Sequence, residues 1–119
     1  MGTFRDLLIW QKSMVLVTEI YTLSNNFPKE EVYALISQLR RSAVSIRSNI
    51  AEGYGRNGNK DYLKFLNMAV ASLFEMQTQL EIAYNLEYIT QLQFNKTYED
   101  SREIERMISA FCRKIKMDL

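Results

Sequence analysis

Two glutamates, Glu52 and Glu75, are the residues whose type and spacing come nearest to a reaction centre. Helical bundles hold carboxylate-bridged metal ions by combining such glutamates with the histidines of Glu-x-x-His repeats. The chain contains no histidine, so it cannot complete this ligand set, and imidazole catalysis is excluded as well. We therefore expect no catalytic residue, no metal and no cofactor. An enzyme that uses Glu52 and Glu75 with a divalent ion is the alternative.

A glycine-rich segment and a single cysteine are the other candidates for chemistry. The segment from Gly53 to Gly58 lacks the Lys-Ser/Thr ending of a phosphate-binding loop, and we interpret it as a helix terminator and connector. Cys112 has no second cysteine to pair with in the chain and no histidine to activate it, which favours a buried thiol over a nucleophile.

The composition favours one globular domain in a reducing compartment. The chain has 119 residues, of which 47% are hydrophobic and 24% charged, and we expect residues 1–119 to form a single domain. The unpaired cysteine and the absence of a long uncharged apolar run predict a cytoplasmic location without a membrane partner.

The net charge of +1 hides an uneven distribution of charged residues. Residues 40–64 contain six basic and two acidic residues, residues 81–105 contain two basic and six acidic residues, and the last fourteen residues are again basic. We therefore expect one end or face to be basic, which would suit the phosphate backbone of RNA or DNA. The nucleic-acid-binding candidates are Arg40, Arg41, Arg47, Arg56, Lys60 and Lys64. The alternative is that these side chains are ordinary solvated charges.

Helices must position these residues, because the apolar residues recur at three and four along the whole chain and no segment alternates with a period of two. Pro28 and the glycines divide the chain into four expected helices, at about residues 4–25, 28–53, 60–86 and 91–116. Thr3, Asn59 and Thr90 are the expected N-caps of the first, third and fourth helices. Similar lengths and short connections predict an all-α fold, an antiparallel up-down-up-down four-helix bundle.

Each expected helix carries an apolar row that would face the bundle core. The row of the second helix consists of Val32, Ile36, Leu39, Ala43, Ile46 and Ile50. The rows of the third and fourth helices consist of Leu66, Ala69, Leu73, Met76, Leu80 and Ala83, and of Ile104, Ile108, Phe111 and Ile115. The first helix is apolar on two faces, which one bundle cannot cover and which favours self-association.

A row of polar residues runs beside the apolar row on each of the two middle helices. We call these two rows together the polar seam, and its residues are Gln38, Ser42, Ser45, Asn49, Glu52, Ser72, Glu75 and Gln79. One interpretation is a buried hydrogen-bonded network between two helices or at a subunit interface, which would set the register of the packing. A solvated face and an active site are the alternatives.

The same stretches resemble a known family, the small bacterial four-helix bundle proteins first recognised as reading frames in intervening sequences of 23S ribosomal RNA genes. The most telling segment is Asn49-Ile50-Ala51-Glu52-Gly53 with Gly55-Arg56, which is similar to the hallmark of that family. Further matching segments are Trp10-Gln11-Lys12, Phe27-Pro28 and Gln38-Leu39-Arg40-Arg41-Ser42-Ala43. The resemblance covers about residues 4–90.

The resemblance implies an assembly and partners but no reaction. The accessory variability determinant proteins of diversity-generating retroelements are similar in fold, and they form homopentamers that bind nucleic acid and a reverse transcriptase. A homopentamer is therefore the implied assembly of this chain, and RNA or DNA its implied ligand. We expect a non-enzymatic oligomeric protein that binds a nucleic-acid backbone, with a scaffold for a protein partner such as a reverse transcriptase as the alternative.

Overall fold

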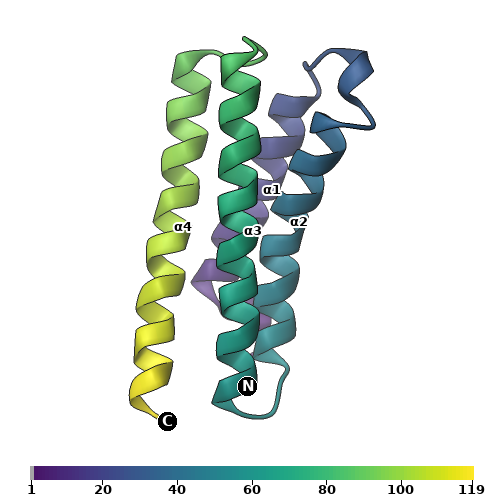
Figure 1. Cartoon of the computed structure of the whole chain (residues 1–119). Helices are drawn as coiled ribbons and strands as arrows, with labels where there is room; N and C mark the ends of the chain where they lie inside the picture. The colour runs from purple at the N-terminus through teal and green to yellow at the C-terminus, as the bar shows by residue number, and fades with distance from the viewer. Residues whose placement is uncertain (1) are drawn as a thin grey trace.

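The computed structural model describes residues 2–119, and all the regular structure in that range is helical. The four long helices are α1 (Leu8–Ser24), α2 (Leu35–Tyr54), α3 (Asn59–Asn85) and α4 (Gln91–Met117). Two short 3-10 turns, η1 (Phe4–Asp6) and η2 (Lys29–Glu31), precede α1 and α2. Successive helices run in opposite directions in an elongated bundle of 46 × 23 × 22 Å (Figure 1). The predicted all-α four-helix bundle is confirmed.

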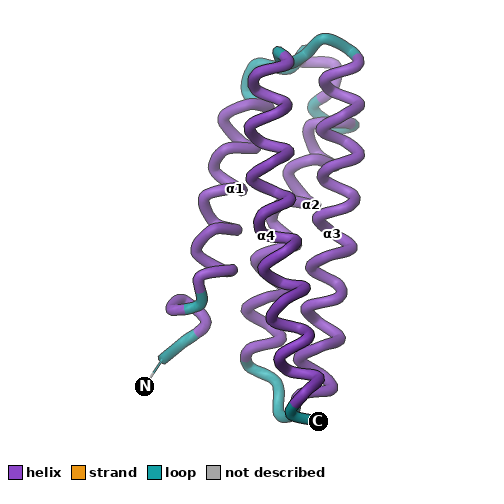
Figure 2. The backbone as a smooth tube through the Cα atoms, turned by 90° about the vertical axis from the view of Figure 1, so that its left-hand side faces the viewer, coloured by secondary structure: helices purple, strands orange, loops and turns teal. Residues whose placement is uncertain are grey.

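The helices are arranged in a ring that follows the order of the chain. α1 lies against α2 and α4, and α3 lies against the same two helices on the other side. Figure 2 shows this packing from a second side, with η1 and the N-terminal residues projecting below the start of α1. The contact between α2 and α3 is the most extensive in the molecule.

The core is built from the predicted apolar rows with two exceptions. The rows of α3 and α4 are buried, apart from Phe111, which is half-buried while the neighbouring Cys112 is buried. The row of α2 is buried from Ile36 onward, but Val32 is 47% exposed, so its predicted place in the core is wrong. No helix within residues 2–119 has the apolar length needed to cross a membrane.

Two predicted helix starts and one predicted N-cap are wrong. The backbone of Leu7 is extended, so Thr3 and Asp6 form their capping box on η1 rather than on α1. Ala34 has a φ of −121° and a ψ of −101°, which interrupts the helix expected from Pro28 and delays α2 to Leu35. Asn59 is the first residue of α3 rather than its cap. The capping box of Thr90 and Gln93 on α4 is confirmed.

The close approach of α2 and α3 depends on small residues. The hydroxyl oxygens of Ser45 and Ser72 are 2.9 Å apart, which brings the two helix backbones near one another at mid-length. At the end of the pair, a Cβ on Gly53 would lie 2.9 Å from the Cβ of Phe65 and from Cδ1 of Tyr62. Gly58, with a φ of +102°, then reverses the chain in a conformation that side chains disfavour. These positions hold the α2–α3 connection tightly against the bundle.

Candidate nucleic-acid interface

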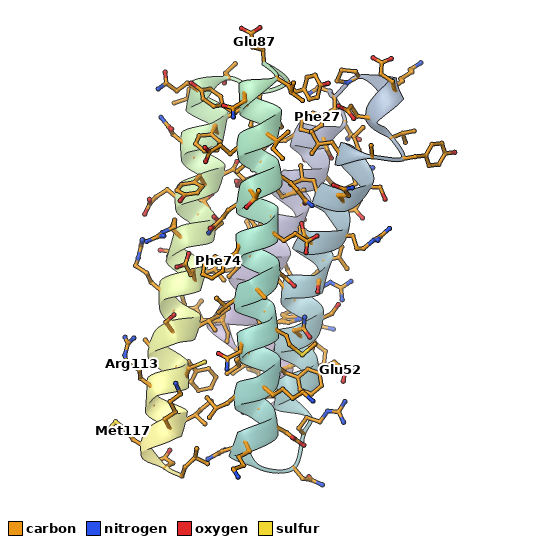
Figure 3. All side chains as sticks on the ribbon, viewed as in Figure 1. Phe27, Glu52, Phe74, Glu87, Arg113 and Met117 are labelled. Atoms are coloured by element: carbon orange, nitrogen blue, oxygen red, sulfur yellow. The ribbon has the colours of Figure 1, made fainter. Side chains whose placement is uncertain are left out.

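Basic side chains from two distant parts of the chain meet at the end of the bundle that contains the α2–α3 connection. In an up-down-up-down bundle, this end also contains the C-terminus of α4. Figure 3 places Glu52 and Arg113 in this half of the molecule and Glu87 at the opposite end. Residues 47–64 and 113–118 together contain seven basic and three acidic residues. We call this set of seven the basic end: Arg47, Arg56, Lys60, Lys64, Arg113, Lys114 and Lys116.

Most of the basic end is available to an external anion. Lys60, Lys64 and the three basic residues of α4 are exposed, and Arg47 is half-buried. The salt bridge between Arg56 and Glu52 is the only one that these seven residues form within the described part of the chain. The positive charge of this end is therefore largely uncompensated by neighbouring carboxylates.

At the opposite end of the bundle, acidic residues outnumber basic residues in the connections between helices. The α1–α2 and α3–α4 connections meet there, where the hydroxyl of Tyr88 donates a hydrogen bond of 2.8 Å to Glu31. Its connections carry Glu30, Glu31 and Glu87 against one cation, Lys29. The two ends of the bundle thus differ in sign, and only the end with the α2–α3 connection suits a polyanion.

Arg40, one of the predicted nucleic-acid-binding residues, makes contacts within the bundle. Its Nε donates a hydrogen bond of 2.8 Å to the hydroxyl of Ser24, and its Nη2 donates one of 2.9 Å to Oδ1 of Asn25. Its guanidinium carbon also lies 4.5 Å from the centre of the Tyr21 ring. Arg40 therefore joins α2 to the end of α1, and most of its donors are occupied.

Arg41 is exposed but lies away from the basic end. It is thirteen residues before Tyr54, the last residue of α2. At 1.5 Å per residue this separation is about 20 Å along the helix. The structure therefore places four of the six predicted residues, Arg47, Arg56, Lys60 and Lys64, at the basic end.

The basic end also includes Arg113, Lys114 and Lys116, which are not among the site residues predicted from sequence. Their positive charge was visible in the sequence, but their distance along the chain from residues 40–64 concealed their proximity. The signal that would have found them is the topology, because the fourth helix of an up-down-up-down bundle ends beside the connection between the second and third.

The polar seam lies between α2 and α3 of the same chain over most of its length. The hydroxyl of Ser72 donates to that of Ser45, and the side-chain amide of Asn49 donates to Ser45 at 3.1 Å. A second group joins Ser42 to Gln79 at 3.1 Å, and Gln79 in turn donates to Glu75 at 3.4 Å. The structure thus brings together six of the eight residues.

Gln38 and Glu52, the two ends of the longer row, are exposed and make no hydrogen bond to the other six within residues 2–119. Glu52 pairs instead with Arg56, with 3.1 Å between Oε2 and Nη2. The two carboxylates considered for a metal, Glu52 and Glu75, thus have different partners. Among residues 2–119 no group of three or more acidic or cysteine side chains is arranged to hold a metal ion.

A cluster of aromatic and thiol groups lies beneath the basic end. The ring of Tyr62 packs edge-on against Tyr54 and Phe111, at centroid distances of 6.5 and 5.5 Å. Burial raises the pKa of Tyr62 to about 12, and the neighbouring Tyr54 and Cys112 add to the shift. Burial also raises the pKa of the Cys112 thiol, which keeps the sulfur protonated and a poor nucleophile.

Comparisons with known proteins agree with this fold and assign no activity. The chain is similar to a protein of unknown function from the S23 ribosomal protein family of Bacteroides thetaiotaomicron, whose crystal structure superposes with a TM-score of 0.80. The two share 27% sequence identity, and the similarity covers 88% of this chain and 98% of the other. No curated protein matches the chain. The family model described as 23S rRNA-intervening sequence protein matches residues 5–110, and the chain belongs to this family.

Proposed function

We propose that this protein is a non-enzymatic, self-associating bundle that binds the phosphate backbone of RNA or DNA through its basic end. The observation that carries the proposal is the gathering of seven basic side chains, from α2, α3, α4 and the α2–α3 connection, at one end of the molecule. One salt bridge, to Glu52, offsets this charge. Contacts of this kind are electrostatic and largely independent of base sequence.

The salt dependence of RNA binding tests the proposal. With four to seven phosphate contacts and a slope of about −0.7 to −0.9 per contact, the logarithm of the affinity for an RNA hairpin should fall with the logarithm of salt concentration at a slope of about −3 to −6. Filter binding or fluorescence anisotropy measures this slope. Failure to bind at low salt, or affinity that is unchanged at high salt, would contradict the proposal.

Single lysine variants locate the interaction on the molecule. Lys60→Ala and Lys64→Ala should each weaken binding and make the salt slope shallower by about one. Lys29→Ala is the matched control, because Lys29 is an exposed lysine at the opposite end of the bundle. Equal losses for all three variants would show that the binding is not localised at the basic end.

The proposal of self-association is supported by the outer surface of α1. Leu8 and Val15 are 55% and 67% exposed, and a groove of about 390 Å³ lined by Val15, Thr18, Glu19, Thr22 and Leu23 has an almost entirely apolar surface. Exposed apolar surface of this kind is typical of interfaces, and a second copy of the chain would cover it. The homopentamer expected from the resemblance is one assembly that would do so.

Light scattering tests the self-association. The wild-type protein should have the mass of an oligomer, and Val15→Glu should lower that mass, since it places a charge in the apolar groove. Leu92→Glu is the control, because Leu92 is 80% exposed on α4 and lies outside the groove. A wild-type protein that is monomeric at all concentrations would contradict self-association and favour a different protein as the partner.

A further inference from the structure

A shallow groove of about 500 Å³ lies along the outer side of α2 at the basic end. Its lining residues are Arg47, Ser48, Ala51, Glu52, Gly55 and Arg56. The volume is in the range of sites that bind small ligands, roughly 300–1,000 Å³. The lining contains two arginines and a single carboxylate, while the Ser48 hydroxyl donates its hydrogen to the backbone carbonyl of Val44. The two guanidinium groups therefore make the groove better suited to a phosphate group than to an apolar ligand.

Arg56 is fixed in position before any ligand binds. Its guanidinium carbon lies 4.7 Å from the centre of the Phe65 ring, and its Nη2 is 3.1 Å from Oε2 of Glu52. Stacking on an aromatic ring fixes the plane of a guanidinium group while leaving its edge free to donate hydrogen bonds. Arg56 therefore loses little conformational freedom on binding an anion, but one of its nitrogens already has an anionic partner.

Arg47 has the opposite character, because it is half-buried and makes no salt bridge or side-chain hydrogen bond within residues 2–119. None of its side-chain nitrogens is buried without a partner among the described residues, so the guanidinium group is open to solvent and can bind an anion in the groove without first losing another partner. The partial negative charge at the C-terminal end of α2 opposes such an anion, but it amounts to about half a unit against two full guanidinium charges. The groove therefore retains a net attraction for anions.

We infer that this groove binds one phosphate group between Arg47 and Arg56, and that Glu52 limits its occupancy by competing with the phosphate for Arg56. This inference rests on the proposed function, because the phosphate of a bound RNA strand is the source that it commits to. Glu52 acts as an internal substitute for the ligand, and its carboxylate must be displaced when the phosphate binds. Removal of that carboxylate should therefore strengthen RNA binding.

The variant that tests this inference is Glu52→Gln, which keeps the length and the helix propensity of the side chain but removes its charge. Its affinity for the RNA hairpin at low salt should rise about threefold to tenfold, in line with the loss of one exposed ion pair and one repulsive charge. Glu99→Gln is the matched control. Glu99 also pairs with an arginine, at 2.8 Å from Arg106, and its change has the same effect on net charge. The control should change the affinity less than twofold, because Glu99 lies near the other end of α4.

A second measurement uses inorganic phosphate as the probe and begins with the wild-type protein. Titration with inorganic phosphate, followed by amide NMR, should shift the resonances of Ser48, Gly55 and Arg56, and Glu52→Gln should tighten that binding as well. Free phosphate also distinguishes the two proposals. If the wild-type protein binds phosphate at these amides but no RNA at low salt, the groove stands as an anion site and the proposed function fails. Two results would overturn the inference about the groove. One is that RNA binds but its affinity for Glu52→Gln is lower than for the wild type or equal to that for Glu99→Gln. The other is that phosphate shifts only amide resonances outside the groove.

Discussion

Replacement of Gly53 by alanine tests the close packing at the basic end. The added Cβ would lie 2.9 Å from both the Cβ of Phe65 and Cδ1 of Tyr62. Carbon atoms in ordinary contact are about 3.5–4.0 Å apart, so α3 would have to shift by roughly 0.6–1 Å. Overpacking of this kind costs about 1–3 kcal/mol, whereas replacing a helical glycine with alanine contributes about 0.5–1 kcal/mol of stability. The net loss in the free energy of unfolding should be about 1 kcal/mol, within a range of about 0–2.5 kcal/mol.

Gly55→Ala is the matched control, because its Cβ would come no closer than 3.7 Å to a neighbouring atom, the carbonyl oxygen of Glu52. Its φ of −81° also suits any residue. Urea denaturation followed by circular dichroism, at one protein concentration, compares the two variants with the wild type. Gly53→Ala should unfold at lower urea, and Gly55→Ala at the same urea concentration or slightly higher. If Gly53→Ala is as stable as the wild type, the close approach of α2 and α3 does not depend on the absence of a side chain at this position.

Three further variants test local features by the same measurement. Glu87→Gly should raise the free energy of unfolding by about 0.5–1 kcal/mol, since Glu87 has a φ of +63°, which glycine adopts without strain; no gain would argue against strain at this turn. Thr90→Ala should lower it by about 1 kcal/mol through loss of the capping box on α4, and an unchanged midpoint would refute that role. Tyr62→Phe should raise it by about 1 kcal/mol, because the hydroxyl of Tyr62 is buried without a hydrogen-bond partner. Because the pKa of Tyr62 is raised to about 12 in the folded state, the wild type should also lose stability as the pH rises from about 10 to about 12, and Tyr62→Phe should lose less.

The helices could be predicted from sequence because burial follows a period that is visible along the chain. Each of the six apolar residues of the α3 row is fully buried, as the spacing from Leu66 to Ala83 predicts. The spacing of Val32 also fits the buried row of α2. The sequence does not show that the backbone leaves the helical conformation at Ala34, which turns Val32 outward. Periodicity therefore predicts which face of a helix is buried better than it predicts where the helix begins.

The candidate site could be predicted only in part, because the partner of a charged side chain is set by the packing of the helices. Arg40 and Arg47 look equivalent in sequence, seven residues apart on one helix. In the structure their surroundings differ, because Arg40 donates hydrogen bonds to Ser24, the last residue of α1, and to Asn25, which follows it. Phe65, on which Arg56 stacks, likewise comes from the next helix. Such contacts depend on how the helices are rotated about their axes.

The opposite signs of the two ends make the molecule an electric dipole whose axis follows its 46 Å length. A polyanion at a distance would exert a torque on it, so that the α2–α3 connection would lead during approach although the net charge is only +1. At physiological ionic strength, salt should screen this steering at distances greater than about 8 Å from the protein. The association rate should therefore decline more steeply with added salt than the net charge alone would suggest, while copies at low salt should tend to line up head to tail.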